Sequence, residues 1–295
     1  MTGPVVARPG VRLSPQGRRL VDLILVVAAI GGLAIGINAL VLHLGMDPLA
    51  DVHAYYDAGT RLNNGIPLYE QDMAGSTGLY LYPPLLAVLF RPLALLPFEV
   101  AAAIWEVVII GAFLLVLRRI GLRRNVFLAL GMLAMPALWT ISIGQAEALV
   151  TLLLAIGSPA AVAVAGNIKL APVLVAVYWL GRRDWRSIRQ LIVWTLALVV
   201  LQFALEPGGT IAYAQAEWLG AAFAVRNISP YAISPLLWVA MVAVLVVLAF
   251  RYAPTRWGWP LAVLLAVLVY PRLLAYQLTS LLAAFGGPRD DRTSH

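Results

Sequence analysis

The sequence predicts an all-α integral membrane protein, a bundle of about eight spanning helices with a range of seven to nine. Hydrophobic residues make up 62% of the chain and charged residues only 12%, whereas a soluble domain carries about 25% charged residues. The mean hydropathy of +0.87 means that lipid must solvate most of the surface. At 295 residues the chain has room for about eight apolar segments of ~20 residues and short loops.

The formal charge of +7 is distributed as short arginine clusters between apolar segments. Such clusters follow the positive-inside rule of membrane proteins and do not form the continuous basic surface that binds nucleic acid. We therefore expect membrane lipids as partners and no nucleic acid. The sequence has no cysteine, and its three histidines lack the spacing of metal ligands, so we expect no metal site.

The N-terminal region, residues 1–19, contains four arginines and precedes the long apolar segment Leu20–Leu44. We expect this region to be cytoplasmic and the apolar segment to be a retained first span, since no convincing small-residue cleavage site follows it. Residues 20–286 then form a single polytopic membrane domain, and the polar tail 287–295 lies in the cytoplasm. The protein is thus expected in the cell membrane as a multi-pass chain.

The other apolar segments are arranged so that every arginine cluster can lie in the cytoplasm. They are Phe98–Leu117, Val126–Ile143, Ala146–Leu180, Ile188–Leu205, Pro235–Phe250, Pro260–Val269 and Leu273–Phe285. The segment Ala146–Leu180 is interrupted at Gly157–Ser158–Pro159, Gly166 and Pro172, which predicts one span plus a broken pair of half-helices that lines a cavity. The segment Tyr82–Pro97 is short and contains prolines, so we expect it to be re-entrant or interfacial.

Two polar loops, residues 45–83 and 206–233, are predicted to be extracytoplasmic, and the first should contain short juxtamembrane helices. If residues 51–62 are helical, Asp51 and Tyr55 lie on one face, and Asn64–Gly65 ends the helix in a turn. A single carboxylate beside the membrane suits a general base that activates a hydroxyl nucleophile. The alternative interpretation of Asp51 is a helix N-cap or a solvated loop acid.

Two cations, Lys169 and Arg272, lie within apolar segments, where a charge costs several kcal/mol and indicates a functional site. Together at an outer cavity they would bind a lipid phosphate, which arginine can contact bidentately. Arg91 could also reach such a phosphate. The alternatives are that Lys169 snorkels or pairs with Asp51 or Glu147, and that the two arginines anchor the chain at the lipid headgroups.

In their order along the chain, several short motifs resemble the pattern of glycosyltransferase family 87. They are Asp51-x-x-x-Tyr55, Gly65-x-x-Leu-Tyr69, Tyr82-Pro-Pro84, Gly144–Gln145, Gly166-x-x-Lys169-x-x-Pro172, Arg226-Asn-Ile-Ser229 and Tyr270-Pro-Arg-Leu-Leu-Ala-Tyr276. Taken alone, the segment that begins at Arg226 is more typical of a turn than of a site. The chain departs from the family pattern in being short, in the trimmed region Ala155–Gly166, and in having Gln277 where an acidic residue is expected.

The resemblance implies a C-type glycosyltransferase (GT-C) fold and the transfer of a hexose, typically mannose, from a polyprenyl-phosphate-linked donor. The acceptor would be a lipid-linked or cell-envelope glycan on the extracytoplasmic face, and the reaction would invert the anomeric centre without a cofactor. Asp51 would be the catalytic base, while Lys169, Arg272 and Arg91 would bind the donor phosphate. The implied substrate-binding residues are His53, Tyr55, Arg61, Tyr82, Gln145, Arg226 and Asn227.

Two other functions remain open from the sequence. A lipid or small-solute transporter or flippase would more often show an inverted repeat with broken helices in both halves, whereas this chain has one broken pair. An inactive homologue that acts as a structural subunit is favoured by the short length.

Overall fold

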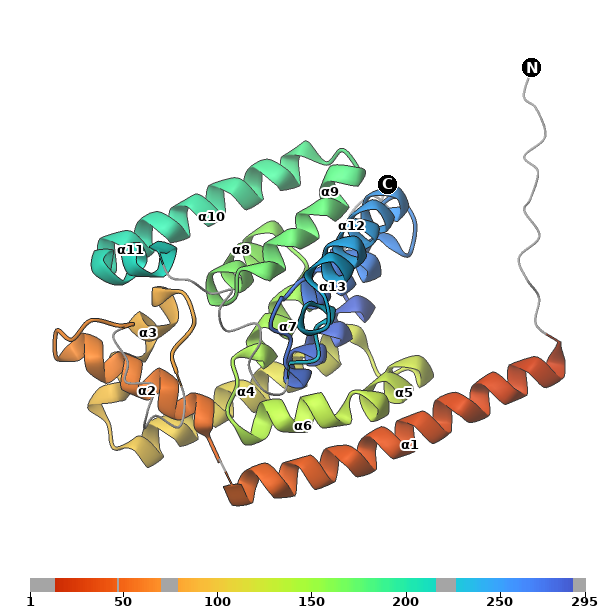
Figure 1. Ribbon diagram of the computed structural model, residues 1–295, viewed down its shortest axis with the longest axis horizontal. Coiled ribbons are helices and arrows are strands. Elements are labelled where there is room, and N and C mark those ends of the chain that lie inside the picture. Colours follow the sequence, from red (N-terminus) through yellow and green to blue (C-terminus); the bar gives the residue numbers. More distant parts are fainter. Residues whose placement is uncertain (1–13, 47, 70–78, 216–226, 289–295) are drawn as a thin grey trace.

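A computed structural model describes residues 14–46, 48–69, 79–215 and 227–288, and these residues form a helical bundle without strands (Figure 1). The prediction of an all-α membrane protein is confirmed. In chain order the elements, with η for 3-10 helices, are α1 (Pro15–Met46), α2 (Ala50–Asn63), α3 (Pro84–Phe90), η1 (Leu93–Leu95), α4 (Phe98–Ile120), α5 (Arg124–Met132), α6 (Ala134–Ser142), α7 (Glu147–Ile156), α8 (Pro159–Ile168), η2 (Ala171–Val175), α9 (Ala176–Gly181), α10 (Trp185–Leu205), α11 (Pro207–Gln215), η4 (Pro230–Ala232), α12 (Pro235–Tyr252), α13 (Gly258–Leu268) and η5 (Ala275–Phe285).

Among the described residues, four helices are long and apolar enough to cross a membrane, namely α1, α4, α10 and α12. The pair α5 and α6, bent by 62°, makes a fifth if it is one broken span. The expected count of about eight is therefore too high. The segments 146–180 and 260–285 form short apolar helices of 10–17 residues instead, and short apolar segments are more often core helices than spans.

The broken segment between residues 146 and 181 is confirmed as a series of short helices. Helix α7 ends at Gly157, whose φ of 69° is unfavourable for other residues, and Pro159 starts α8. Helix α8 continues through Gly166 to Ile168, so the break that we expected at Gly166 is absent. The chain breaks instead at Lys169, the C-terminal cap of α8, and Pro172 lies within η2.

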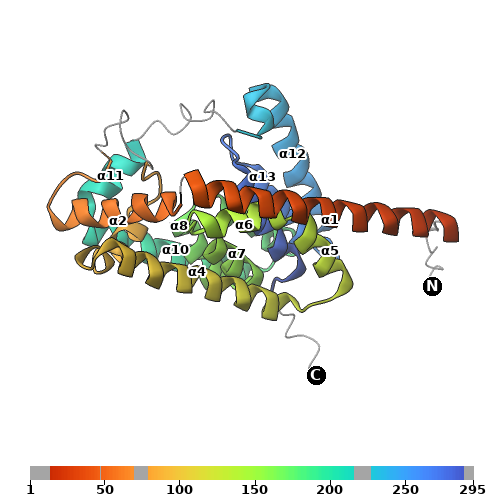
Figure 2. The same cartoon turned by 90° about the horizontal axis from the view of Figure 1, so that it is seen from below.

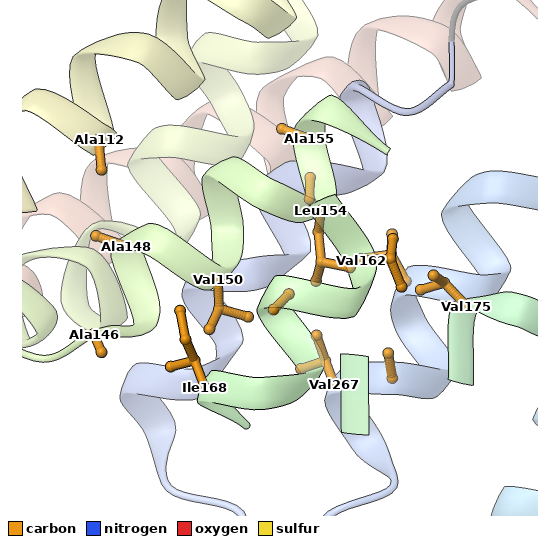
Figure 3. Close-up of a cluster of buried hydrophobic side chains, with 14 of the residues drawn as sticks. Ala112, Ala146, Ala148, Val150, Leu154, Ala155, Val162, Ile168, Val175 and Val267 are labelled. Atoms are coloured by element: carbon orange, nitrogen blue, oxygen red, sulfur yellow. The ribbon is translucent and has the colours of Figure 1, made fainter. Parts of the chain in front are cut away.

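The core lies between α4, α7, α8 and α13 and consists mainly of small aliphatic side chains (Figure 3). Ala148 and Val150 of α7 and Val162 of α8 are at most 2% exposed, as is Leu154. Small residues let helices approach closely, which is the main source of packing energy between helices in lipid.

Helix α1 packs along α5 and α6 through glycines, as Figure 1 shows at the lower edge of the bundle. A Cβ atom at Gly32 would lie 2.4 Å from the carbonyl oxygen of Gly131, and one at Gly36 would lie 2.7 Å from the backbone of Ala134. Gly32 and Gly36, four positions apart on α1, thus allow the close contact between α1 and the bent pair of helices α5 and α6.

The two ends of the bundle are formed by different elements (Figures 1 and 2). Helices α2, α3 and α11 gather at one end, which we name the Asp51 end. The turn between α9 and α10, the connection from α4 to α5 and the start of α1 lie at the opposite end, which we name the basic end. The arginines of these connections, at positions 118, 119, 123, 124, 182, 183 and 186, give the basic end its charge.

Candidate active site

The carboxylate of Asp51 lies in the first turn of α2, and that turn is fixed to the end of α6. The amide nitrogens of Leu49 and Asp51 donate to the carbonyl oxygens of Ser142 and Ile143, each at 3.0 Å. Leu49 occupies the N-cap position with a left-handed φ of 59°, which is rare for a leucine. Asp51 is therefore not the helix cap, and the N-cap interpretation of this acid is excluded.

Gln145 is fully buried and connects Asp51 to two tyrosines. Its Nε2 atom donates to Oδ2 of Asp51 at 2.9 Å and to the hydroxyl of Tyr82 at 2.8 Å. Its Oε1 atom accepts from the hydroxyl of Tyr55 at 2.8 Å, and that hydroxyl accepts from the amide of Ala146 at 3.2 Å. Asp51 and Tyr55 thus lie on one face of α2, as expected from the spacing, and both contact the same amide group.

The glycine before Gln145 is required by its surroundings. Gly144 has a φ of 66°, and a Cβ atom there would lie 2.1 Å from Val52 and 2.7 Å from Glu106. Its carbonyl oxygen accepts from the indole nitrogen of Trp105 at 2.7 Å. The Gly144–Gln145 pair therefore lets the chain turn closely against α2 and α4 while it directs the amide toward Asp51.

The two tyrosines at Gln145 are neutral hydrogen-bond donors. Burial, followed by the negative charge of Asp51, raises the pKa of the Tyr55 hydroxyl well above its usual value. Burial, followed by the neighbouring Tyr55, raises the pKa of Tyr82 in the same direction. Around Gln145, the carboxylate of Asp51 is thus hydrogen-bonded within a network of neutral hydroxyl and amide groups.

The segment that contains Tyr82 is held by its own aromatic neighbours. The hydroxyl of Tyr80 donates to the carbonyl oxygen of Pro83 at 2.6 Å and accepts from the amide of Ala87 at 2.9 Å. The hydroxyl of Tyr69 donates to the carbonyl oxygen of Tyr82 at 2.6 Å. The position of Tyr82 is therefore fixed by hydrogen bonds from Tyr69 and from the neighbouring Tyr80, which both belong to the first loop.

Beside Tyr82 lies a cavity of about 560 Å³, which we name the Lys169 cavity. Lys169 and Arg272 are the two charged residues in its lining among the described residues. Its other lining residues are apolar or neutral; they are Leu81, Tyr82, Pro83, Ile168, Leu170, Ala171, Val173, Leu174, Tyr213, Val269, Tyr270, Pro271, Leu274, Tyr276 and Gln277. The fold therefore brings together two cations that are 103 positions apart in the chain (272 − 169).

Lys169 is buried and paired with an acid. Its Nζ atom lies 2.6 Å from Oε2 of Glu147, and the side chains are 6% and 4% exposed. The second carboxylate oxygen accepts from the hydroxyl of Ser280. The ammonium group also lies over the ring of Tyr276, 4.8 Å from its centroid, and 5.5 Å from that of Tyr82. Of the two acids considered as partners for Lys169, the structure selects Glu147.

Arg272 is held by the backbone around it. Asn227 donates from Nδ2 to the carbonyl oxygen of Pro271 at 2.9 Å, and its Oδ1 accepts from the amide of Leu273 at 2.9 Å. These two contacts clamp the residues on either side of Arg272. The Nε atom of Arg272 is buried and has no hydrogen-bond partner among the described residues. A buried donor of this kind is normally satisfied, so it marks a place where an acceptor would be stabilised.

The remaining expected site residues lie elsewhere. His53 stacks on Phe98 with a centroid distance of 3.8 Å, and Arg61 donates to the carbonyl oxygen of Pro67 at 3.0 and 2.7 Å. Arg91 is exposed, and its Nε atom donates to Oδ1 of Asn63 at 3.1 Å. None of the three lines the Lys169 cavity. Arg226 lies outside the described residues.

Three further residues complete the site; the sequence indicated Glu147 only as an alternative partner of Lys169 and Tyr276 only as part of a motif, and it did not indicate Ser280. Glu147 fixes Lys169, Ser280 holds Glu147, and the ring of Tyr276 contacts the ammonium group. An acid two positions after Gln145, within an apolar segment, was a usable signal for Glu147. Ser280 carries no such signal, because serine is common in apolar helices. Among the described residues, no group of three or more His, Cys, Asp or Glu side chains is arranged to hold a metal ion.

Comparisons with known proteins give the same family as the motifs. Residues 80–285 match the family model described as Glycosyltransferase family 87. Two curated relatives, from Mycolicibacterium smegmatis and Mycobacterium tuberculosis, carry the name polyprenol-phosphate-mannose-dependent alpha-(1-2)-phosphatidylinositol pentamannoside mannosyltransferase. The first is 31% identical over 61% of this chain and 48% of its own length, and the second is 31% identical over 45% and 36%. No solved structure matches the chain.

The matched part covers less than half the length of these relatives. The family match, residues 80–285, includes Tyr82, Gln145, Lys169 and Arg272, whereas Asp51 lies before it begins. Because the family model covers well over half of this chain, from the aromatic segment at the first loop to η5, the protein belongs to glycosyltransferase family 87.

Proposed function

We propose that this chain transfers a mannosyl group from a polyprenyl-phosphate-linked donor to a lipid-linked or cell-envelope glycan on the extracytoplasmic face of the cell membrane. The observation that carries the proposal is the connection between the carboxylate and the two-cation cavity. Tyr82 contacts Gln145 with its hydroxyl, Gln145 contacts Asp51, and Tyr82 also lines the Lys169 cavity. Tyr82 thus lies between a candidate base and a candidate anion site. Displacement of phosphate from a sugar requires both, because the base activates the attacking hydroxyl and the anion site stabilises the leaving phosphate.

The charges in the cavity support different roles for the two cations. Glu147 already offsets the charge of Lys169, so the pair contributes little net charge. Arg272 has no acidic partner among the described residues and presents a buried donor. We therefore assign the donor phosphate first to Arg272, with Lys169 contributing hydrogen bonds at the edge of the site.

The lining of the cavity also suits a lipid-linked donor. Most of its lining residues are apolar, and two of them, Leu170 and Leu174, are 55% and 37% exposed at the surface of the bundle. A polyprenyl chain could lie along these leucines while its phosphate sits between the cations. A soluble nucleotide sugar would need a polar pocket for its base and ribose, which this lining does not provide.

In the proposed reaction, Asp51 accepts the proton of the acceptor hydroxyl, and the oxygen atom of that hydroxyl attacks the anomeric carbon of the donor sugar. The bond between that carbon and the phosphate oxygen breaks, and polyprenyl phosphate leaves with the electron pair. Attack opposite to the leaving group inverts the anomeric centre. Gln145 orients Asp51, and Arg272 stabilises the negative charge that develops on the phosphate. No metal or cofactor takes part in this scheme.

The decisive experiment measures mannose transfer by the purified chain with a polyprenyl-phosphate-mannose donor. A phosphatidylinositol mannoside is the first acceptor to use, since the curated relatives are named for such an acceptor. We expect Asp51→Asn to slow transfer by about 10²–10⁴-fold, the range typical of a general base, and to leave donor binding intact. Full activity of this variant would remove Asp51 from the mechanism.

Asp57→Asn is the matched control, because Asp57 lies on the same helix with an exposed side chain. We expect this variant to retain transfer activity. If the unmodified chain binds donor but transfers nothing, the result favours an inactive homologue that serves as a structural subunit. Donor movement across a bilayer without transfer would favour a flippase.

A further inference from the structure

The buried carboxylate of Glu147 acts on the Lys169 cavity, although Glu147 is not part of the lining. Helices α7 and α8 lie side by side (Figure 3). Glu147, in the first turn of α7, thereby reaches Lys169 at the end of α8, with 2.6 Å between the two charged groups. The ammonium group that lines the cavity is therefore present there together with its counterion.

The carboxylate of Glu147 is held in place by hydroxyl groups of two helices. Its Oε2 atom contacts Lys169, and its Oε1 atom accepts from the hydroxyl of Ser280. The hydroxyl oxygens of Ser280 and Thr151 lie 3.0 Å apart, and the Thr151 hydroxyl donates to the carbonyl oxygen of Glu147 at 2.7 Å. Because both carboxylate oxygens are occupied within a buried network, the negative charge stays beside Lys169.

The charged groups at the cavity add up to one net positive charge. Lys169 and Arg272 are the charged residues in the described lining, and Glu147 offsets one of these two charges. The buried Nε atom of Arg272 has no hydrogen-bond partner among the described residues. A ligand charge that is not offset in a poorly hydrated site costs free energy, so a second negative charge on the ligand is disfavoured. The negative charge of Asp51, on the other side of Tyr82, adds to this effect.

Lipid-linked sugars differ in the charge that they would bring into such a cavity. A sugar joined to a polyprenyl chain through one phosphate is a phosphate diester with one negative charge, whereas a diphosphate linkage carries two. A phosphate monoester, the form in which the lipid leaves after transfer, carries about −1.5 to −2 at pH 7. The net charge of the cavity thus matches the monophosphate-linked donor and neither of the other two lipids.

We propose that Glu147 is a specificity-determining residue that acts through Lys169. By offsetting one of the two cations, it makes the cavity select a monophosphate-linked donor over a diphosphate-linked one. The same charge balance weakens the binding of the leaving polyprenyl phosphate and so favours its release. This inference rests on the function proposed above, because it takes the Lys169 cavity as the site of the donor phosphate.

The test compares two synthetic ligands, mannosyl farnesyl phosphate and mannosyl farnesyl diphosphate, which differ by one phosphate. Their binding to the full chain in uncharged micelles is followed through the unfolding midpoint, without an acceptor. We expect the unaltered chain to bind the monophosphate at least about tenfold more tightly than the diphosphate. In Glu147→Gln, which keeps the shape of the side chain and adds one unit of net positive charge, this ratio should fall about tenfold or more. Farnesyl phosphate, which stands for the leaving lipid, should gain affinity in the same variant.

Glu147→Met/Lys169→Met is the matched control, because it removes both members of the pair and leaves the net charge of the cavity unchanged. We expect this double variant to keep the ligand preference of the unaltered chain. If it shifted the preference as Glu147→Gln does, shape and not charge would set the selectivity, and the proposal would be wrong. An equal ratio in the unaltered chain and in Glu147→Gln would overturn it as well.

A variant at the rim of the cavity serves if Glu147→Gln does not fold. Leu170 lines the cavity and is 55% exposed, so Leu170→Lys adds a cation while the buried pair stays intact. It should also shift the preference toward the diphosphate, and an unchanged ratio would contradict the charge balance. If neither ligand bound the unaltered chain, both this inference and the proposed donor site would fail. The expected ratios without any mannose transfer to an acceptor would support the role of Glu147 and overturn the proposed reaction alone.

Discussion

The Lys169 cavity and the basic end hold positive charge in opposite ways. In the first, the lysine is 6% exposed and has an acid at 2.6 Å, and Arg272 is fixed through the clamped backbone on both sides. In the second, Arg186 is exposed and Arg182 is partly exposed. A buried charge must be offset in place, whereas an exposed charge is solvated and screened. The comparison separates a site built around buried, fixed charges from a surface on which the charged groups are solvated.

The same comparison explains why the carboxylate at Asp51 needs so many neighbours. Its orientation depends on Gln145, whose amide contacts Asp51, Tyr55 and Tyr82. Such a network has few alternative arrangements, because each buried polar atom that loses its partner costs about 1–3 kcal/mol. The basic end has no comparable requirement, since water can replace most of its contacts.

The largest effect on stability should come from breaking the buried pair. We expect Glu147→Ala to lower the free energy of unfolding by about 3–5 kcal/mol, since it leaves Lys169 as a buried charge without its acid. Denaturant unfolding of the chain in micelles measures this loss. Arg186→Gln, at the exposed basic end, is the counterpart and should change stability by less than about 0.5 kcal/mol.

A second variant shows whether the cost comes from the unpaired charge. Glu147→Met/Lys169→Met removes both charges and keeps similar volumes, so it should recover most of the stability that Glu147→Ala loses. If Glu147→Ala and Arg186→Gln changed the free energy of unfolding by equally small amounts, the contrast between the Lys169 cavity and the basic end would be wrong.

The next effect concerns donor binding at Arg272. We expect Arg272→Gln to weaken binding of a polyprenyl-phosphate donor about tenfold or more, equivalent to about 1.4 kcal/mol. The variant removes the cation of the Lys169 cavity whose buried Nε atom has no hydrogen-bond partner among the described residues. Binding is measured with a non-transferable donor analogue. Arg91→Gln is the control, since Arg91 is exposed and contacts Asn63 outside the cavity. Equal donor affinity in the two variants would shift the phosphate site away from Arg272.

Local features of this site were predictable from the sequence. The helix expected over residues 51–62 is α2, Ala50–Asn63, and its end at Asn64–Gly65 follows from the left-handed φ of 67° at Gly65. The search for charged residues within apolar segments also singled out Lys169 and Arg272, because a charge within the membrane is costly wherever it occurs. Both predictions rest on rules that act over a few residues.

The bridging role of Gln145 was not predictable in this detail. Its amide and Asp51 are 94 positions apart, and only the packing of α2 against the end of α6 brings them together. The predicted number of membrane spans was too high for a related reason. A buried core helix and a spanning helix are both apolar, and only packing distinguishes α7, with most residues inside, from α10, where 11% of the apolar window is buried.

The smallest expected effect is that of Asp57→Asn. It tests whether the cost of losing a charged side chain depends on the burial of that side chain or on the end of the bundle at which it lies. Asp57 lies on α2 at the Asp51 end, but its side chain is exposed. Partial removal of water raises the pKa of its carboxyl group, while His53 and Arg61 oppose the shift. The folded chain therefore binds this proton more tightly than the unfolded chain. The contribution of protonated Asp57 to the stability of the folded chain is therefore fully present below the unfolded pKa of about 3.9. It is lost as the pH rises through the pKa of the folded chain.

At neutral pH, Asp57 is thus slightly destabilising, and Asp57→Asn should raise the unfolding midpoint a little at pH 7. The effect should be at most a few tenths of a kcal/mol, since solvent screens an exposed charge. The difference between the variant and the unaltered chain should shrink as the pH falls toward the unfolded pKa, which paired unfolding curves would detect. A loss as large as that of Glu147→Ala would mean that every charge at the Asp51 end is part of one fixed network, and that exposure does not separate Asp57 from Lys169.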